Sequence, residues 1–325
     1  MKNIRWAILG LAAVVAGCSP SKQVVSVVNG KEITKDELTA RLMQGPAAKA
    51  TLRGLMLQAL VMDAAAKQGI TVTDDDVNQL MQFRRDQFAP QRFDEANAQA
   101  GNTDASMRED ARTQIALQRL AMKGSKVSDE SITKYYNADK TEFVKPEWRQ
   151  VGFIVAKDKA DADNAISAVK SGADFATVAE KFCIPQAKQL AGQYQWYGVV
   201  NKQLVNEQKV PVNQARAGLA SIPSVAKAIE KTPQGKAISI PFPGGPAVVV
   251  LYVKTVAPGG KLPLTEAKSQ IAFTIASKNN EVKPTVMQDI VKAAKVDVKM
   301  DQFKELAKPE VLFPSELMGG SQPPM

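Results

Sequence analysis

The sequence predicts an α+β protein in which helical segments at both ends of the chain flank an inserted α+β domain. Three observations predict this arrangement. The stretch Ala47–Lys145 contains a single proline, Pro90, and therefore can form long helices. The stretch Pro185–Pro263 holds nine of the eighteen prolines, and proline breaks helices and central strands. Helical periodicity then returns over Thr265–Ser277 and Val286–Ala294.

The first elements follow from β-branched residues and a turn. We expect Val24–Val28 to form a strand, and Asn29-Gly30 is typical of the tight turn that follows one. Thr34 is expected to begin a helix, because its hydroxyl can cap the first turn and Glu37 stands at the capping-box spacing. The next helix ends at Gly69, and its apolar face holds Leu52, Leu55, Met56, Ala59 and Leu60.

Three further helices are predicted before the insert. Thr73 followed by Asp74–Asp76 is typical of a helix start, with a hydroxyl cap and acidic residues in the first turn. A calcium loop would need alternating ligands, which this run lacks. An amphipathic helix is expected over residues 103–123, and a short one from Ser128 to Tyr136.

The insert begins after Pro146 and is expected to be a compact α+β unit of about 110 residues, an ordinary size for a small domain. Irregular, proline-rich residues are expected between its second helix and its last strand. The predicted elements are a strand at Val151–Ala156, helices at Asp161–Lys170 and Asp174–Phe182, and a final strand at Ala247–Val256.

After the helical return, the sequence predicts a short strand at Val296–Met300. The segment Pro309–Met325 contains four prolines and two adjacent glycines. We therefore expect residues 301–325 to form a mobile tail.

The first seventeen residues are predicted to be a signal peptide. Lys2 and Arg5 precede the apolar run Trp6–Gly17, whose twelve residues are too few for a membrane-spanning helix, which needs about twenty. The run ends in Val-Ala-Gly before Cys18, which resembles the lipobox of bacterial lipoproteins. That resemblance implies cleavage before Cys18 and lipidation of its sulfur and new amino group. An ordinary cleavage that leaves Cys18 incidental is the alternative.

Composition excludes several classes of protein and of mechanism. Of 325 residues, 45% are apolar and 23% charged, which excludes a disordered chain and a polytopic membrane protein. The chain contains no histidine, so every Ser-His-Asp or Cys-His mechanism is excluded. Cys18 and Cys183 are too few for a four-cysteine zinc site. We expect Cys183 to be a small buried hydrophobe rather than a reactive thiol.

Charge indicates the possible partners. Removal of Lys2 and Arg5 with the signal peptide lowers the net charge from +9 to +7. The remaining excess is spread over the second half without a dense basic run. Such a surface favours anionic membrane, cell-wall polymer or acidic client chains, although a merely solvated surface explains it equally well. We expect no nucleic-acid partner and no cofactor.

Several phrases along the chain resemble one known family. They include Val25–Leu38, Gly69–Asp74 and Val127–Glu130. Others are the two-helix phrase within Ala162–Ala179, Ile240-Pro241 before the strand Val248–Val253, and the last helices within Leu264–Ala294. In this order and spacing they are similar to the extracytoplasmic parvulin-type foldases, the SurA and PrsA chaperones.

The resemblance implies a domain plan. It consists of a signal peptide (residues 1–17), an N-terminal helical chaperone domain (18–144) and a parvulin-like domain (145–258). C-terminal helices (259–300) complete the chaperone domain, and the tail (301–325) follows. It also implies prolyl cis-trans isomerisation at a hydrophobic slot beside two histidines and an Asp or Cys.

Carrying the family site over to this sequence gives no catalytic residue. The first histidine falls on Gly152 and the second near Ala247, while the Asp or Cys falls near Pro185. The Met and Phe of the slot fall near Ser221 and Val225, and an extra stretch at Asn201–Ser221 interrupts the usual spacing. We therefore interpret residues 145–258 as a degenerate parvulin domain and assign no catalytic, cofactor or metal residue.

Three hypotheses follow. The first is a lipid-anchored chaperone that binds unfolded exported polypeptides. The second is an active isomerase with a histidine-free slot, in which Phe242 is a residue to test. The third is a non-catalytic envelope-assembly lipoprotein. In each case the protein is exported and anchored through Cys18 to the outer face of the cell membrane or to an outer membrane facing the periplasm. In the lipoproteins that this N-terminus resembles, an aspartate after the lipidated cysteine signals retention in the inner membrane. Residue 19 is a serine, so the resemblance implies the outer membrane in a bacterium that has one.

Flexible or aromatic side chains are the candidate client contacts. Methionine suits surfaces that accept many sequences, but we expect most of the methionines in the helical domain to be buried and a minority to line a groove. We expect the aromatic residues of the insert to lie in its core rather than in a peptide site. The methionines are Met43, Met56, Met62, Met81, Met107 and Met122, and the aromatic residues are Trp148, Tyr194, Trp196 and Tyr197.

Overall fold

The computed structural model describes residues 23–138, 143–200, 202–215 and 218–314. These residues form two units. The first combines the described residues up to Leu57 with Lys295–Pro314, and the second contains the described part of Gln58–Ala294. Each unit is described by itself.

A hairpin and a helix begin the first unit. The strands β1 (Val24–Val28) and β2 (Lys31–Thr34) pair antiparallel. Asn29 and Gly30 join them with φ values of 50° and 80°, the left-handed conformation that a two-residue hairpin turn requires. The hydroxyl of Thr34 then accepts the backbone N–H of Glu37 at 3.2 Å and caps α1 (Lys35–Gln44). The expected strand, turn and helix start are confirmed.

The C-terminal part of the first unit corrects two expectations. Residues 296–300 form no strand, and the 3-10 helix η3 (Asp301–Ala307) and the short helix α12 (Pro309–Leu312) follow them. Phe303 and Leu306 are buried, and Lys49 lies 2.5 Å from Glu305. The prediction of a mobile tail from residue 301 is therefore wrong for residues 301–314, because apolar side chains anchor this segment. Residues 315–325 lie outside the described residues.

Helices in the second unit start and end where the sequence predicts. Thr73 and Asp76 form a reciprocal capping box at the start of α3, and Thr103 and Ser106 form one at the start of α5. Helix α2 ends before Gly69, whose φ is 70°. The helices are α2 (Pro46–Lys67, shared with the first unit), α3 (Asp74–Asp86), α4 (Arg92–Gln99), α5 (Asp104–Ala121), α6 (Asp129–Ala138), α10 (Leu264–Lys278) and α11 (Val286–Ala293).

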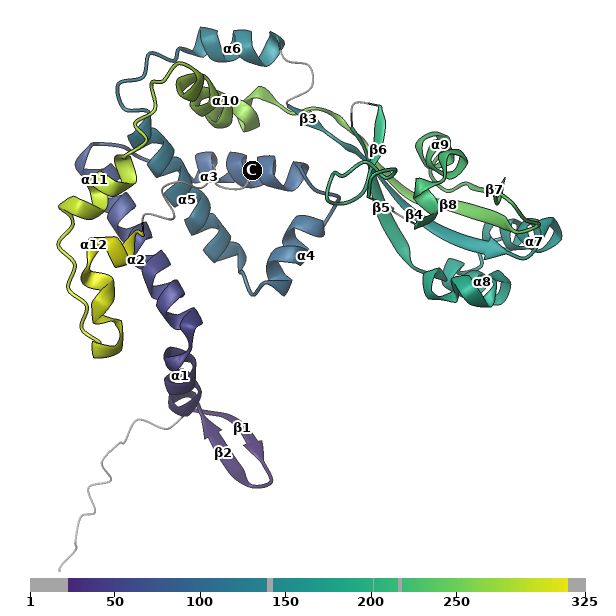
Figure 1. Ribbon diagram of the computed structural model, residues 1–325, viewed down its shortest axis with the longest axis horizontal. Helices are drawn as coiled ribbons and strands as arrows, with labels where there is room; N and C mark the ends of the chain where they lie inside the picture. Colours follow the sequence, from purple (N-terminus) through teal and green to yellow (C-terminus); the bar gives the residue numbers. More distant parts are fainter. Residues whose placement is uncertain (1–22, 139–142, 201, 216–217, 315–325) are drawn as a thin grey trace, which may run out of the picture. The chain divides into compact units, whose positions relative to one another are not determined.

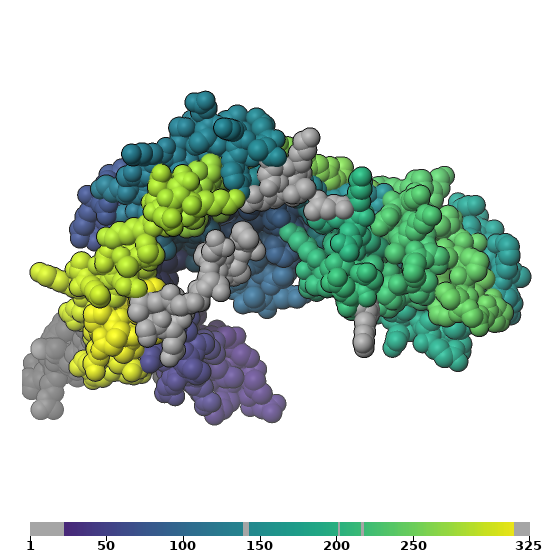
Figure 2. Space-filling view, turned by 45° about the horizontal axis from the view of Figure 1, so that its top comes forward, coloured from purple at the N-terminus to yellow at the C-terminus, as the bar shows by residue number. Residues whose placement is uncertain are grey.

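The C-terminal helices pack onto the earlier ones, as the sequence predicts. Ala267 and Ile271 of α10 share a core with Ile132 of α6, and α10 also contacts α3. Helix α11 packs against α5. In the space-filling view the yellow-green C-terminal helices lie against teal atoms of the earlier helices (Figure 2). Helix α4 was not predicted.

A two-stranded ribbon joins the helices to the sheet-containing part. Strand β3 (Val144–Lys145) pairs antiparallel with β9 (Gly260–Lys261), so the chain leaves and returns at neighbouring positions. Between them lies an antiparallel sheet of order β6-β5-β4-β8-β7. Its strands are β4 (Glu147–Ala156), β5 (Tyr194–Val200), β6 (Gln203–Val205), β7 (Ala237–Pro241) and β8 (Val248–Ala257).

Helices cover both faces of this sheet (Figure 1). Ile154 and Val250 face α7 (Lys159–Lys170) and α8 (Phe175–Phe182). Successive residues of a strand point to opposite faces, so Phe153 and Leu251 face the other side. There they meet η2 (Gly218–Ser221) and α9 (Pro223–Lys231). The short helix η1 (Pro185–Leu190) follows α8.

The stretch expected to be irregular contains regular structure. Strand β5 lies in it, and α9 begins with Pro223. Proline is compatible with the first turn of a helix because that turn has no use for its missing N–H. Among the described residues, no helix has the length and apolar character needed to cross a membrane.

Candidate functional site

A cavity of about 270 Å³ lies on the α9 side of the sheet. Strand β5 provides its floor and the segment after β6 provides one wall. Half of its lining comes from the extra stretch 201–221. The lining residues are Phe153, Leu190, Gln195, Trp196, Tyr197, Asn206, Glu207, Gln208, Gly218 and Leu219.

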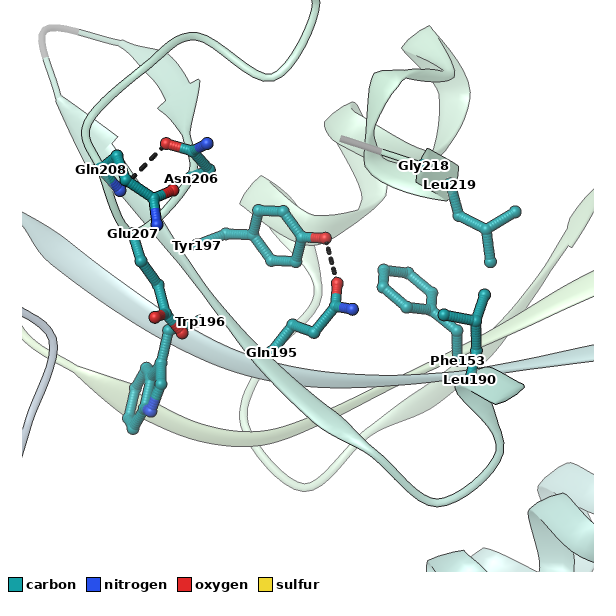
Figure 3. A pocket seen from close by; sticks show the side chains of 10 residues that line it. All are labelled: Phe153, Leu190, Gln195, Trp196, Tyr197, Asn206, Glu207, Gln208, Gly218 and Leu219. Carbon is teal, nitrogen blue, oxygen red and sulfur yellow. Dashed lines mark hydrogen bonds between the residues drawn. The ribbon is translucent and has the colours of Figure 1, made fainter. Parts of the chain in front are cut away.

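The cavity has an apolar end and a polar end (Figure 3). Phe153, Leu190 and Leu219 gather at the apolar end, and the segment Asn206–Gln208 lies at the polar end. Tyr197 lies between the two ends, and its ring is edge-on to that of Phe153 with centroids 6.4 Å apart. Such an arrangement offers an apolar surface to a side chain and hydrogen-bonding groups to a backbone.

The central polar group is a neutral pair. The phenol of Tyr197 donates to Oε1 of Gln195 at 2.6 Å. Burial, together with the negative charge of Glu207, raises the pKa of Tyr197 to about 12. The phenol is therefore protonated at neutral pH and cannot act as a general base there.

The wall after β6 is held by local hydrogen bonds. Oδ1 of Asn206 accepts the backbone N–H of Gln208 at 3.0 Å and of Val210 at 2.9 Å, which closes a tight loop. Lys209 adopts a positive φ of 59° within it. Without the Asn206 side chain, the backbone N–H groups of Gln208 and Val210 would lose this acceptor.

Two side chains attach this loop to the helical part of the second unit. Arg92 donates to Oε1 of Glu207 through Nη2 at 2.9 Å and through Nε at 3.2 Å. Hydrogen bonds to Glu207 and Glu95 raise the pKa of Arg92. Lys209 Nζ donates to Oε1 of Gln87 at 2.8 Å, and burial lowers the pKa of this lysine. Arg92 and Gln87, which lie in the helical part, thus hold the loop that forms this wall of the cavity.

The five positions assigned by resemblance do not line this cavity. A Cβ on Gly152 would lie 2.3 Å from Cε1 of Phe175, so position 152 faces α8, and Phe153 is the β4 residue in the cavity. The assignment of the first histidine to Gly152 is therefore one residue away from the β4 position that faces the cavity. Of the others, Pro185 begins η1 and Ser221 ends η2, Val225 of α9 is buried in the core, and Ala247 lies in the loop before β8.

The other sequence candidates have structural roles. Cys183 is buried and its thiol donates to the Ala187 carbonyl at 3.5 Å, which confirms the small-hydrophobe interpretation. Trp148 and Trp196 pack together with Ala89. The ring of Tyr194 packs at a tilt against that of Phe175, and of these four aromatic residues only Trp196 and Tyr197 line the cavity. In the described part of the chain, no group of three or more His, Cys, Asp or Glu is placed to hold a metal.

The expectation for the methionines is only partly correct. Met81 and Met107 are buried, and the other four are partly exposed, so most are not buried as expected. Met43 and Met56 line a groove of about 620 Å³ in the first unit, next to Met300 and Phe303. Met107 lines a cavity among the helices of the second unit, so half of the six methionines, not a minority, line a groove or cavity. Cys18 lies outside the described residues.

Sequence reasoning missed Gln195, the loop Asn206–Gln208 and Arg92. The polar run between Val205 and Val210 signals a turn. Nothing in the sequence indicates that Arg92 lies beside Glu207, because they are 115 residues apart.

Comparisons with known proteins place these features in context. Residues 127–269 match the model of the PPIC-type PPIase domain. The chain is 23% identical over 314 residues to the foldase protein PrsA of Geobacillus sp. (strain WCH70), covering 94% of this chain and 99% of that one. It is 21% identical over 322 residues to PrsA of Halalkalibacterium halodurans, covering 94% and 88%. A SurA-like chaperone structure from Campylobacter jejuni shares 18% identity, covering 85% of this chain and 100% of that one, with a TM-score of 0.35.

Proposed function

Because the chain belongs to the parvulin-type family of SurA- and PrsA-like foldases, we propose that it is a lipid-anchored chaperone that holds unfolded exported polypeptides. Its parvulin-like part contributes a binding surface without the usual catalytic residues. We propose that residues 18–144 with 259–300 form the chaperone domain and that residues 145–258 form the parvulin-like domain.

The observation that carries this proposal is a cavity whose central polar pair, Tyr197 and Gln195, is neutral, in a chain without histidine. The cavity presents the Tyr197–Gln195 pair and an apolar end, and the chain has no histidine to line the usual family site. Prolyl exchange has a barrier of about 18–20 kcal/mol because the peptide C–N bond has partial double-bond character. Peptide binding needs only the apolar and hydrogen-bonding surface, which is present.

The location is proposed from the N-terminal sequence. Cleavage before Cys18 and lipidation of that residue would anchor the protein outside the cytoplasm, since each buried methylene contributes about 0.8 kcal/mol. Labelling of growing cells with an alkyne fatty acid tests this. We expect label on the wild-type chain and none on Cys18→Ser, with release of the variant from the membrane fraction. Equal labelling of both would refute the anchor.

The alternative of an active isomerase is supported by one observation. Phe153, Leu190 and Leu219 make one end of the cavity apolar, and a less polar medium favours the twisted, less charge-separated peptide bond. Exchange spectroscopy on an Ala-Pro-Phe peptide separates the two possibilities. We expect the uncatalysed rate with the purified protein. Phe242 packs against the core of the sheet and does not line the cavity. A catalysed rate that Leu219→Ala, at the apolar end of the cavity, abolishes would establish the isomerase instead.

Aggregation of an unfolded protein tests the chaperone directly. We expect the purified protein to suppress light scattering by a chemically unfolded substrate at stoichiometric concentration. If scattering is unchanged and proline exchange is also uncatalysed, the protein would be an envelope-assembly lipoprotein that reuses this fold.

A further inference from the structure

A second cavity lies among the helices of the second unit and shares no residue with the first. It measures about 390 Å³ and is formed by α3, α4, α5 and α10. Helix α5 lines it with Met107, Asp110, Gln114 and Gln118, whose spacing of three and four residues places them on one face. Its apolar walls are Leu80, Phe83, Phe88, Phe93 and Phe273.

Three buried amide atoms at this cavity have no hydrogen-bond partner. They are Nε2 of Gln87, Oε1 of Gln118 and Nε2 of Gln270, and they make up three of the five such atoms in the described part of the chain. Gln118 is only 7% exposed. A buried polar atom without a partner is unfavourable and uncommon in folded proteins. A ligand in this cavity would supply partners to all three atoms.

The surrounding contacts show that this is not general under-packing. The asparagines at the same cavity are paired: Asn97 Nδ2 donates to the Phe93 carbonyl at 2.8 Å, and Asn102 Nδ2 donates to Asn97 Oδ1 at 3.1 Å. Oε1 of Gln87 accepts from Lys209 at 2.8 Å, which leaves its Nε2 as the free end of that amide. The unsatisfied atoms therefore belong to the glutamines alone.

The one cation at the cavity also has a neutral partner. The guanidinium of Arg84 donates to Oε1 of Gln114. Asp110 accepts from Gln58 Nε2 at 2.8 Å. The walls of the cavity thus hold two unpartnered amide donors, one unpartnered amide acceptor, the guanidinium of Arg84 and the carboxylate of Asp110 among aromatic rings. This set matches a main-chain peptide group, whose carbonyl accepts and whose N–H donates.

We propose that this cavity binds one large apolar side chain, preferably aromatic, of an extended polypeptide together with the peptide groups beside it. The side chain lies among the phenylalanines, and Phe88, which is 40% exposed and has its ring centroid 5.5 Å from that of Phe93, stands at the mouth. Gln87 and Gln270 donate to peptide carbonyls, and Gln118 accepts a peptide N–H. The volume is at the lower end of the range of about 300–1,000 Å³ for ligand pockets. This inference rests on the proposed binding of unfolded polypeptides and adds where one segment is held.

Binding of a capped pentapeptide to the purified full-length protein tests the proposal. The probe has one central phenylalanine between alanines, and the all-alanine pentapeptide is its control. Titration calorimetry measures the affinity. We expect the wild type to bind the all-alanine peptide at least about tenfold more weakly than the phenylalanine peptide. We also expect Gln118→Leu to bind the phenylalanine peptide at least about tenfold more weakly than the wild type does. The side-chain amide NMR signals of Gln118 and Gln270 are expected to shift on binding.

Stability separates a binding role from a structural one. Gln118→Leu removes a buried unsatisfied atom, so we expect its melting temperature to equal or exceed that of the wild type while binding falls. Gln270→Leu is a second variant with the same expectation, and Gln99→Leu, at an exposed position of α4, is the control that leaves binding unchanged. Wild-type affinity in both cavity variants would overturn the proposal.

The outcome is distinguishable from failure of the chaperone function. If the wild type suppresses aggregation but both cavity variants bind the pentapeptide normally, this inference is wrong and the chaperone function stands. If the pentapeptide binds and loses affinity in the variants while aggregation is not suppressed, the cavity assignment stands and the chaperone function is wrong.

Discussion

Gly152 allows a direct test of which residue of β4 faces the candidate site. A Cβ at this position would lie 2.3 Å from Cε1 and 2.8 Å from Cζ of Phe175, whereas ordinary contacts begin at 3.4 Å. The ring would have to move by about 1 Å. It has little freedom to do so, because Phe175 is 3% exposed and its ring centroid is 5.4 Å from that of Tyr194 and 5.3 Å from that of Tyr252.

We therefore expect Gly152→Ala to destabilise the protein by overpacking, at a cost of about 1–3 kcal/mol. For a unit of this size, each kcal/mol lowers the melting temperature by about 2–4 °C. The expected decrease is thus about 2–12 °C.

Thermal unfolding followed by circular dichroism measures this change. Gly245→Ala is the matched control, since a Cβ there meets no atom within 4 Å, and its melting temperature should be that of the wild type. Shortening the ring in the double variant Gly152→Ala with Phe175→Leu should recover part of the loss. A Gly152→Ala protein that melts like the wild type would refute the conclusion that this position faces α8.

Three other predictions follow. Phe153→His places an imidazole in the cavity beside Tyr197. We expect this variant to catalyse proline exchange faster than the wild type and Gly152→His not to do so. A faster exchange rate with Gly152→His than with Phe153→His, measured by exchange spectroscopy, would contradict this prediction. For Asp76, burial acts to raise the pKa, but hydrogen bonds from Arg119 and Thr73 outweigh it and lower the pKa below 3.8. Its carboxylate therefore stabilises the fold above pH 3.8, and this contribution is lost as pH falls through the folded-state pKa. Urea unfolding should show that Asp76→Asn lowers the free energy of unfolding by about 1–2 kcal/mol at neutral pH and by less in acid. An equal loss at the two pH values would count against this role of the carboxylate. Burial raises the pKa of Tyr194 and of Tyr197 from 10.0 to about 12, so the folded state stays protonated where the unfolded state ionises. Stability should therefore fall between pH 10 and pH 12, and Tyr197→Phe should reduce that fall; an unchanged pH profile would argue against burial of this phenol.

Helix starts were the most predictable features of the fold. Thr34, Thr73, Thr103 and Asp174 each accept a backbone N–H three residues later in the structure. Such caps depend on residues that are adjacent in sequence, so the pattern is readable without tertiary information. The C-terminal helices were also predictable from their apolar periodicity, whereas their packing onto the earlier helices was implied by the family resemblance.

Elements that depend on distant partners were less predictable. Val296–Met300 alternates like a strand, but no strand pairs with it in the structure, and a strand without a neighbour is not stable. The sequence does not predict helix α9 because it lies in the proline-rich stretch, although proline is compatible with the first turn of a helix, where Pro223 stands.

The candidate site was only partly predictable for the same reason. The absence of histidine is a property of the composition and needs no structure. The face of β4 that meets the cavity depends on the strand register, in which Gly152 pairs with Tyr252 and Phe153 with Leu251. A shift of one residue exchanges the two faces, so the sequence alone does not distinguish position 152 from position 153.

The ribbon formed by β3 and β9 brings the two ends of the inserted segment together. Val144 pairs with Lys261, and Lys145 pairs with Gly260, so the inserted segment begins and ends at one place. A segment whose ends are neighbours can be deleted, duplicated or exchanged for another without redirecting the polypeptide on either side. Residues 146–259 are therefore a segment whose replacement would not require the chain on either side to change direction. Exchange of residues 146–259 would leave the path of the helices unchanged, but it would remove the hydrogen bonds that Glu207 and Lys209 make with Arg92 and Gln87.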